Sequence, residues 1–231
     1  MDCESINWTQ AEAALRATGF ARLGPVITAV EAAGLIAKYA DETAFRSRVD
    51  MQRYRFGRGE YQYFAYPLPD SVQALRTRLY AGLAPAANRW MADLRIESQF
   101  PAALDPFLVT CHAAGQTRPT PLLLRYRQGD FNCLHQDLYG DIVFPFQVVI
   151  GLSDPAADYD GGELLLVEQQ PRAQSIGHAI RLARGEAAVI TTRYRPAPGE
   201  RGFHRTNMRH GVSPVLRGER YTLGVIFHDA K

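Results

Sequence analysis

The pattern of apolar and polar positions changes character about halfway along the chain of 231 residues. Over residues 1–117, apolar side chains recur at the spacing of amphipathic helices, and Thr28 and Glu31 have the spacing of a capping box. Residues 53–64 instead alternate and contain a Gly-Arg-Gly turn at 57–59, which predicts a β-hairpin among the helices.

From residue 118 onwards, short apolar stretches follow one another with Gly, Pro and Asp between them and with no long helical pattern. The stretches that predict strands are residues 122–126, 133–137, 143–152, 163–168, 179–183, 187–192, 207–212 and 220–227. Strands in this kind of succession are typical of a jelly roll or barrel. We therefore expect a mainly β protein with flanking helices. Residues 1–231 would form a single domain, in which the helical region 1–117 supports a jelly-roll core over residues 118–231.

Composition limits the possible classes of protein. The hydrophobic content of 46% is ordinary for a globular chain, and no apolar run reaches the roughly 18 residues that a membrane span needs. The polar N-terminus lacks the pattern of a secretory signal, so we expect a cytoplasmic protein with no membrane partner. The 3 cysteines contain no Cys-x-x-Cys, which argues against a disulfide framework or a cysteine zinc site. Monomer and homodimer both remain open.

A His-x-Asp pair, His135 and Asp137, lies within the predicted strand 133–137. Side chains two residues apart on a strand project to the same face, so the pair can bind one metal ion, although a surface pair is the alternative. His210, which opens the segment leading into the last strand, is the best third ligand, with His204 as its competitor. Two histidines and a carboxylate form the facial arrangement of non-haem Fe(II) oxygenases, which leaves three coordination positions open.

The surroundings of this candidate site contain groups that suit an organic acid. Arg220 follows His210 by ten residues, and Thr222 shares its strand face. A guanidinium with a nearby hydroxyl suits the distal carboxylate of a co-substrate. Tyr126, nine residues before His135, lies on the preceding strand. Gln147 points either into the barrel or outwards, and the sequence leaves both orientations open.

These residues occur in a recognisable order, which is Tyr126, His135-x-Asp137, Gly161-Gly162, His210 and Arg220-x-Thr222. In this order the chain resembles the Fe(II)- and 2-oxoglutarate-dependent dioxygenases of the double-stranded β-helix fold, over roughly residues 118–228. Longer strings are similar to a narrower group of oxygenases predicted to remove alkyl damage from nucleic acid, akin to the AlkB-like and prolyl-4-hydroxylase-like branches. Those strings are residues 118–126, 134–141, 144–149 and 209–229.

The resemblance implies roles for individual residues. The implied ligands of Fe(II) are His135, Asp137 and His210. The residues implied to contact 2-oxoglutarate are Arg220, which would bind its far carboxylate, and Thr222, Tyr126 and Gln147. The implied reaction consumes O2 and 2-oxoglutarate, releases succinate and CO2, and hydroxylates a substrate C–H bond. On an N-methyl group the product would collapse to the free amine and formaldehyde, whereas on carbon it would remain an alcohol.

Two arginine-rich segments bear on the substrate. Residues 46–58 and 193–209 each hold five arginines against one acidic residue, a local net charge of +4 (5 − 1), and the second segment includes Arg201. Arginines that contact phosphates, together with aromatic faces that stack on bases, would suit alkylated DNA or RNA. The candidate substrate residues are Arg53, Arg55, Tyr61, Tyr63, Arg193, Arg205 and Arg209. Alternatively, the arginines are solvated and the aromatic rings fill the interface between helices and barrel.

The leading function is therefore oxidative demethylation of alkylated nucleobases. The alternatives are hydroxylation of a protein side chain or a small metabolite, and a non-catalytic relative that binds metal or nucleic acid. The complete set His135, Asp137, His210 and Arg220 argues against a non-catalytic protein. A zinc hydrolase with the same three ligands would give Arg220 no obvious task. Whether residues 193–206 form a lid over the site stays open.

Overall fold

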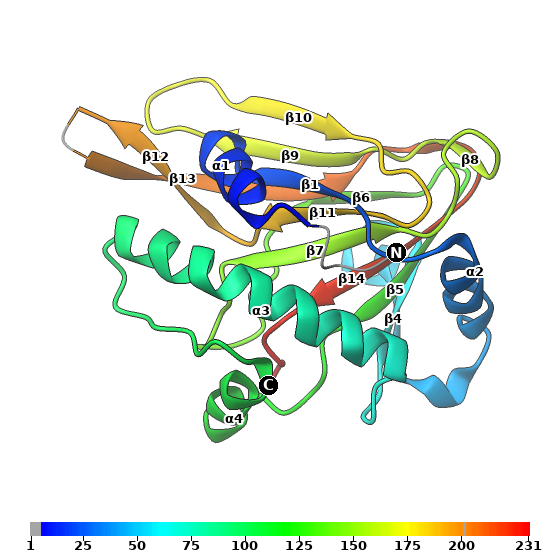
Figure 1. The fold of residues 1–231 in the computed structure, drawn as a ribbon. Helices are drawn as coiled ribbons and strands as arrows, with labels where there is room; N and C mark the ends of the chain where they lie inside the picture. The colour runs from blue at the N-terminus through cyan, green and yellow to red at the C-terminus, as the bar shows by residue number, and fades with distance from the viewer. Residues whose placement is uncertain (1–5, 201) are drawn as a thin grey trace.

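The computed structural model describes residues 6–200 and 202–231 as two β-sheets with helices on the outside (Figure 1). The helices are α1 (Trp8–Thr18), α2 (Ala29–Lys38), α3 (Asp70–Asp93) and α4 (Leu104–Ala113), with short 3-10 helices at Glu42–Ala44 and Met51–Tyr54. The first strands are β1 (Phe20–Pro25), β2 (Phe45–Asp50), β3 (Gly57–Arg58), β4 (Glu60–Phe64), β5 (Leu122–Arg127), β6 (Phe131–His135) and β7 (Phe146–Gly151). The others are β8 (Tyr159–Gly161), β9 (Leu164–Gln169), β10 (Ile176–Ile180), β11 (Glu186–Thr191), β12 (Tyr194–Gly199), β13 (Gly202–Val212) and β14 (Val215–Ile226).

The strands form a larger and a smaller sheet. The larger sheet has the order β1-β11-β7-β14-β5-β4-β2, with β8 paired to β14. The smaller sheet has the order β10-β9-β13-β6-β3, with β12 paired to β13. Each of these pairings is antiparallel, and neighbours in a sheet are often distant in the chain. The expectation of a mainly β protein with flanking helices is confirmed.

The region 1–117 is less helical than the sequence pattern predicts. It contributes β1, β2 and β4 to the larger sheet and β3 to the smaller one. The predicted hairpin over residues 53–64 is wrong, because β3 pairs with β6 whereas β4 pairs with β2 and β5. The chain crosses between the sheets at Gly57 and Gly59, which have φ values of 137° and 120° that favour glycine. The Gly-Arg-Gly sequence therefore marks a change of sheet and not a hairpin turn.

Helix α3 lies across the outer face of the larger sheet (Figure 1). Its buried residues Leu75, Leu79, Leu83 and Trp90 recur at helical spacing and face the strands. Trp90 packs edge-on against Phe146 of β7, with 5.0 Å between ring centroids. No helix of the described residues is long and apolar enough to cross a membrane. Because strand side chains alternate, the residues between those that face α3 point towards the smaller sheet.

A buried ion pair joins α3 to the end of the chain. Arg76 and Asp229 are both fully buried, and Nη2 of Arg76 donates to Oδ1 of Asp229 at 2.7 Å. The guanidinium also donates to the carbonyl oxygens of Ile226 and Phe227 at 3.0 and 2.9 Å. Oδ2 of Asp229 contacts Nε2 of His112 at 2.8 Å. The guanidinium of Arg76 and the carboxylate of Asp229 therefore take their hydrogen-bond partners from within the protein.

Replacing Arg76 with leucine should destabilise the fold strongly. The substitution leaves the carboxylate of Asp229 buried without its cation, which typically costs about 3–5 kcal/mol. We expect a loss of this size in the free energy of unfolding, measured by urea denaturation. The matched control is Arg22→Leu, which breaks a half-exposed pair with Glu186 and should cost at most about 1 kcal/mol. Equal losses in the two variants would show that burial does not control the strength of these pairs.

Candidate metal centre

The pairing of β6 with β13 brings two distant histidines together. His135, the last residue of β6, lies directly opposite His210 of β13 in the antiparallel register. Side chains opposite each other on neighbouring strands share one face of the sheet. The ring centroids of these histidines are 4.2 Å apart. The exposed His204 lies nearer the start of β13 and does not join them.

Asp137 completes the cluster from a position that differs from the predicted one. Strand β6 ends at His135, so Asp137 lies in the following loop and not on the strand 133–137 that the pattern predicts. Its Oδ2 is 3.1 Å from Nε2 of His210, and its Oδ1 is 3.5 Å from Nε2 of His135. One ligand atom from each of the three residues lies within 4.8 Å of the others. The arrangement can therefore hold a metal ion.

Interactions outside the cluster hold this loop in place. The side chain of Gln136 donates to the carbonyl oxygen of Met208 at 2.8 Å, which ties the start of the loop to β13. The buried side chain of Gln116 donates to the carbonyl oxygen of Ile142 and accepts from its amide, at 2.9 and 2.8 Å. A Cβ on Gly140 would lie 2.3 Å from Cδ of Gln116, so this close approach requires glycine. Asp137 is therefore positioned without belonging to a strand.

The protonation of the cluster suits metal binding. Nδ1 of His135 lies 2.8 Å from the carbonyl oxygen of Cys133, which can only accept, so Nδ1 carries a proton and Nε2 is the nitrogen left for a metal ion. Burial opposes it, but the carboxylate of Asp137 raises the pKa of His135, so a metal ion at Nε2 competes with a proton. Burial alone would raise the pKa of Asp137, but the adjacent imidazoles of His210 and His135 hold it well below its usual range. Burial lowers the pKa of His210, and the positive charge of a protonated His135 would lower it further. Asp137 is thus a carboxylate and His210 a neutral imidazole, as ligands must be.

Arg220 provides an unpaired positive charge near this cluster. The residue lies on β14 opposite Tyr126 of β5, and only 3% of it is exposed. Its Nε and Nη1 atoms have no hydrogen-bond partner among the described residues. A Cβ on Gly162 would lie 2.9 Å from Cδ of Arg220, and the φ of 61° at Gly162 also favours glycine. A buried guanidinium without a counter-ion is costly, so the site is built to receive an anion.

One cavity of about 360 Å³ joins Arg220 to the cluster and takes its walls from both sheets. Thr222 and Tyr126 line it, and the hydroxyl of Tyr126 accepts from the side-chain amide of Asn132 at 3.3 Å. Gln147 also lines the cavity, with its amide nitrogen 3.4 Å from Nε2 of His210, so it points inwards. The volume lies near the lower end of the range for small-molecule sites, roughly 300–1,000 Å³.

The predicted substrate residues divide into two groups. Arg55, Tyr61 and Tyr63 line the cavity, whereas Arg53 lies outside it. The other three arginines do not converge on the cavity, because Arg193 and Arg205 pack over the ring of Tyr194 and Arg209 is exposed.

The basic character predicted for residues 193–209 is also reduced by pairing. Arg195 is buried and forms a salt bridge with Glu168, with Nη2 2.6 Å from Oε1. Arg201 lies outside the described residues. The segment forms the hairpin of β12 and β13, which extends away from the sheets in Figure 1. Its local charge of +4 therefore does not describe a basic surface at the cavity.

Two further features belong to the site, and the first of them, the contact of Tyr139, was not predicted. The hydroxyl of Tyr139 donates to Oδ1 of Asp137 at 2.6 Å. Tyr54 and Phe56 form a stacked and exposed pair of rings, with centroids 5.6 Å apart, beside the cavity-lining Arg55. The spacing of Asp137 and Tyr139 could have suggested a contact, but only on the assumption of a strand that the structure does not contain.

Comparison with solved structures identifies the class of this fold. A Pseudomonas putida prolyl-4-hydroxylase superposes with a TM-score of 0.57 at 17% identity, covering 96% of this chain and 100% of the other. A Burkholderia pseudomallei oxidoreductase of the 2OG-Fe(II) oxygenase family superposes with a TM-score of 0.56 at 17% identity, covering 100% and 96%. The two-sheet fold is therefore the jelly roll of the 2-oxoglutarate/Fe(II) oxygenases, as the sequence predicted.

Sequence comparison then gives the family. Residues 59–230 match the model of the Oxygenase-NA family, described as "Oxygenase, catalysing oxidative methylation of damaged DNA". The Mycobacterium tuberculosis H37Rv protein named "Uncharacterized protein Rv2227" is 54% identical over 167 residues, which are 72% of each chain. The chain belongs to the Oxygenase-NA family. It is therefore an oxygenase, an oxidoreductase, with the fold of the 2OG-Fe(II) oxygenases and a His-Asp-His cluster that can hold a metal ion, and the resemblance predicted from sequence is confirmed.

A buried histidine beneath the site loop should make stability depend on pH. His228 is fully buried, its Nδ1 accepts from the amide of Phe144 at 3.3 Å, and burial lowers its pKa to about 4. The unfolded chain would bind a proton near pH 6.5. The stability from this residue is therefore fully present above pH 6.5 and is lost as the pH falls from 6.5 towards 4.

We expect protonation of His228 to lower the free energy of unfolding by on the order of 3 kcal/mol as the pH falls from 6.5 to 4. The measurement is urea denaturation of the metal-free protein at a series of pH values. His228→Gln, which cannot titrate, should flatten the dependence of stability on pH. The exposed His204→Gln should leave the dependence as it is in the wild type. A His228→Gln variant that keeps the wild-type dependence would show that other groups cause the acid sensitivity.

Proposed function

We propose that this oxygenase removes methyl groups oxidatively from alkylated nucleobases, with His135, Asp137 and His210 as the ligands of Fe(II). The observation that carries the assignment of the site is the unpaired Arg220, which shares one cavity with the His-Asp-His cluster. An anion-binding guanidinium next to three metal ligands suits a co-substrate that bridges both groups. 2-Oxoglutarate has this chemistry, because one end can chelate the ion while the other ends in a carboxylate.

The residues around Arg220 support this orientation of the co-substrate. The guanidinium can bind the far carboxylate through two parallel hydrogen bonds, which is its preferred geometry. Thr222 follows Arg220 by two residues on the same strand face, and its hydroxyl can donate to the same carboxylate. The hydroxyl of Tyr126 lines the cavity from the paired strand β5. A zinc hydrolase with these ligands would leave Arg220 without a partner.

Bound Fe(II), with 2-oxoglutarate and O2, would supply the oxidising chemistry. The work of the chain itself is to bind and orient. The Nε2 atoms of His135 and His210 and the carboxylate of Asp137 offer three ligands on one side, and three positions remain for co-substrate and O2. Apolar walls such as Leu122, Leu124 and Leu164 exclude water from the cavity.

The proposed removal of a methyl group balances in atoms. An N-methyl group, O2 and 2-oxoglutarate would give an N-hydroxymethyl group, succinate and CO2. The N-hydroxymethyl product then breaks its C–N bond, which releases formaldehyde and returns a proton to the nitrogen. Oxidation of a methylated base thus reverses the damage, which fits the damaged DNA in the description of the family.

The rim of the cavity supports a nucleic acid substrate. Arg53 and Arg55 form no ion pair within the described residues, and Arg55 reaches the cavity from a left-handed backbone conformation at φ 60°. Tyr54 and Phe56 are 58% and 48% exposed. Stacking of a base on such rings contributes about 1–3 kcal/mol, and arginines between them can contact phosphates. A cavity of this size would admit one base only after it leaves the duplex stack, so single-stranded substrate is favoured.

Replacing Arg220 with alanine should weaken 2-oxoglutarate binding by at least about 30-fold. Removing one partner of a buried, hydrogen-bonded charge pair costs about 2 kcal/mol or more. The measurement is the KM for 2-oxoglutarate in a succinate-formation assay, or calorimetric titration where turnover is too low. Arg217→Ala is the control, because Arg217 lies on the same strand but is exposed. Unchanged affinity in Arg220→Ala would contradict the proposed position of the carboxylate.

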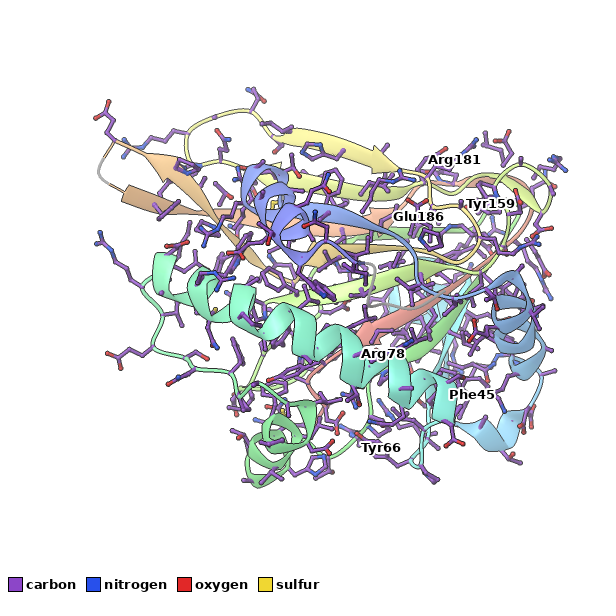
Figure 2. All side chains as sticks on the ribbon, in the orientation of Figure 1. Phe45, Tyr66, Arg78, Tyr159, Arg181 and Glu186 are labelled. Carbon is purple, nitrogen blue, oxygen red and sulfur yellow. The ribbon has the colours of Figure 1, made fainter. Side chains whose placement is uncertain are left out.

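Formaldehyde release should occur with N-methylated single-stranded oligonucleotides and not with proline-containing peptides. Arg55→Ala should raise the KM for the oligonucleotide and reduce the dependence of log KM on log salt by about one unit, because one phosphate contact is lost. The control is Arg78→Ala, since Arg78 lies exposed on α3 (Figure 2). If peptides stimulate succinate formation and no nucleic acid does, the proposed substrate is wrong while the oxygenase class stands.

A further inference from the structure

We infer that Tyr139 is a positioning residue of the iron site, which holds the carboxylate of Asp137 so that one oxygen faces the metal. The inference rests on the ligand roles proposed above. Tyr139 is not one of the three candidate ligands, and the sequence analysis did not place it in the site. Its hydroxyl contacts the only one of the three candidate ligands that lies outside regular secondary structure.

The two oxygens of Asp137 have different surroundings. Oδ1 accepts the hydrogen bond from the hydroxyl of Tyr139 at 2.6 Å, which is the length of a strong bond from a hydroxyl to a carboxylate. Oδ2 lies 3.1 Å from Nε2 of His210. With Oδ1 engaged by Tyr139, Oδ2 is the oxygen available to the ion. Binding through one oxygen keeps three coordination positions open, whereas binding through both would leave two.

Tyr139 is itself oriented by a second tyrosine. The hydroxyl of Tyr63 on β4 donates to the hydroxyl of Tyr139 at 3.0 Å. Because that oxygen accepts from Tyr63, its own proton is directed to Asp137, and hydrogen bonds in such a chain strengthen one another. Tyr63 is 8% exposed, and the guanidinium of Arg46 lies 4.5 Å above its ring. The chain of hydroxyls therefore runs from the larger sheet to the metal ligand.

The backbone of Tyr139 is fixed from the other side. Its carbonyl oxygen accepts from the amide of Lys231 at 3.2 Å. The next residue, Gly140, packs directly against Gln116. A strand would fix the direction of Asp137 through its neighbours, but Asp137 lies two residues beyond the end of β6. Tyr139 supplies the missing constraint, because its backbone and its hydroxyl are both held.

The test is calorimetric titration of the metal-free protein with Mn2+ in the absence of 2-oxoglutarate. Tyr139→Phe removes the donor and keeps the ring, and we expect Mn2+ affinity to fall about tenfold, as is usual when a partner of a metal ligand is lost. Tyr63→Phe should have a smaller effect, because it acts through Tyr139. The control is Tyr221→Phe, whose hydroxyl donates to Glu219 at 3.4 Å and to no other group of residues 6–200 and 202–231, and which should bind Mn2+ as the wild type does.

Asp137→Ala separates this inference from the proposed ligand set. If wild type binds Mn2+ and Asp137→Ala does not, while Tyr139→Phe keeps affinity within twofold of wild type, the positioning role is wrong and the ligands stand. If the wild type binds no Mn2+, both are wrong. A loss of affinity in Tyr139→Phe with an unchanged unfolding midpoint supports the role, whereas an equal loss in Tyr221→Phe would contradict it.

Discussion

The register between β6 and β13 is the constraint on which the site depends. It sets His135 opposite His210, although 75 residues separate them in the chain (210 − 135). A shift of one residue in this pairing would turn one of the two imidazoles to the other face of the sheet. The register is secured by β9 on the other side of β13 and by the link from Gln136 to Met208 at the end of β6. The geometry of the candidate metal centre is thus a property of the smaller sheet.

The larger sheet contributes the second half of the site. Its residues alternate, so that one face packs against α3 while Gln147, Thr222 and Arg220 point into the cavity. Arg220 is buried there without a counter-ion among the described residues, whereas the fully buried Arg76 on the helical side has Asp229. The two buried arginines therefore differ in whether the chain itself supplies the opposite charge. In the proposed function, a carboxylate of the co-substrate would supply the counter-ion that Arg220 lacks among the described residues.

The sequence predicted those parts of the structure that depend on local periodicity or on a characteristic order of residues. The mainly β core with its flanking helices, the capping box at Thr28 and the inward-facing cluster all follow from such patterns. It could not predict the path of residues 53–64, because alternation does not reveal which sheet a strand joins. A count of charges along residues 193–209 could not reveal that Arg195 is neutralised, because its partner Glu168 lies on another strand. The sequence could not predict the hydrogen bond from Tyr139 to Asp137, because it forms in a loop that distant residues hold in place.

The most direct test of the account is a crystal structure of the protein grown without oxygen in the presence of Mn2+ and 2-oxoglutarate. The account predicts an ion bound by His135, Asp137 and His210, with the far carboxylate of 2-oxoglutarate paired to Arg220. An ion bound elsewhere, or a dicarboxylate that leaves Arg220 without a partner, would contradict it.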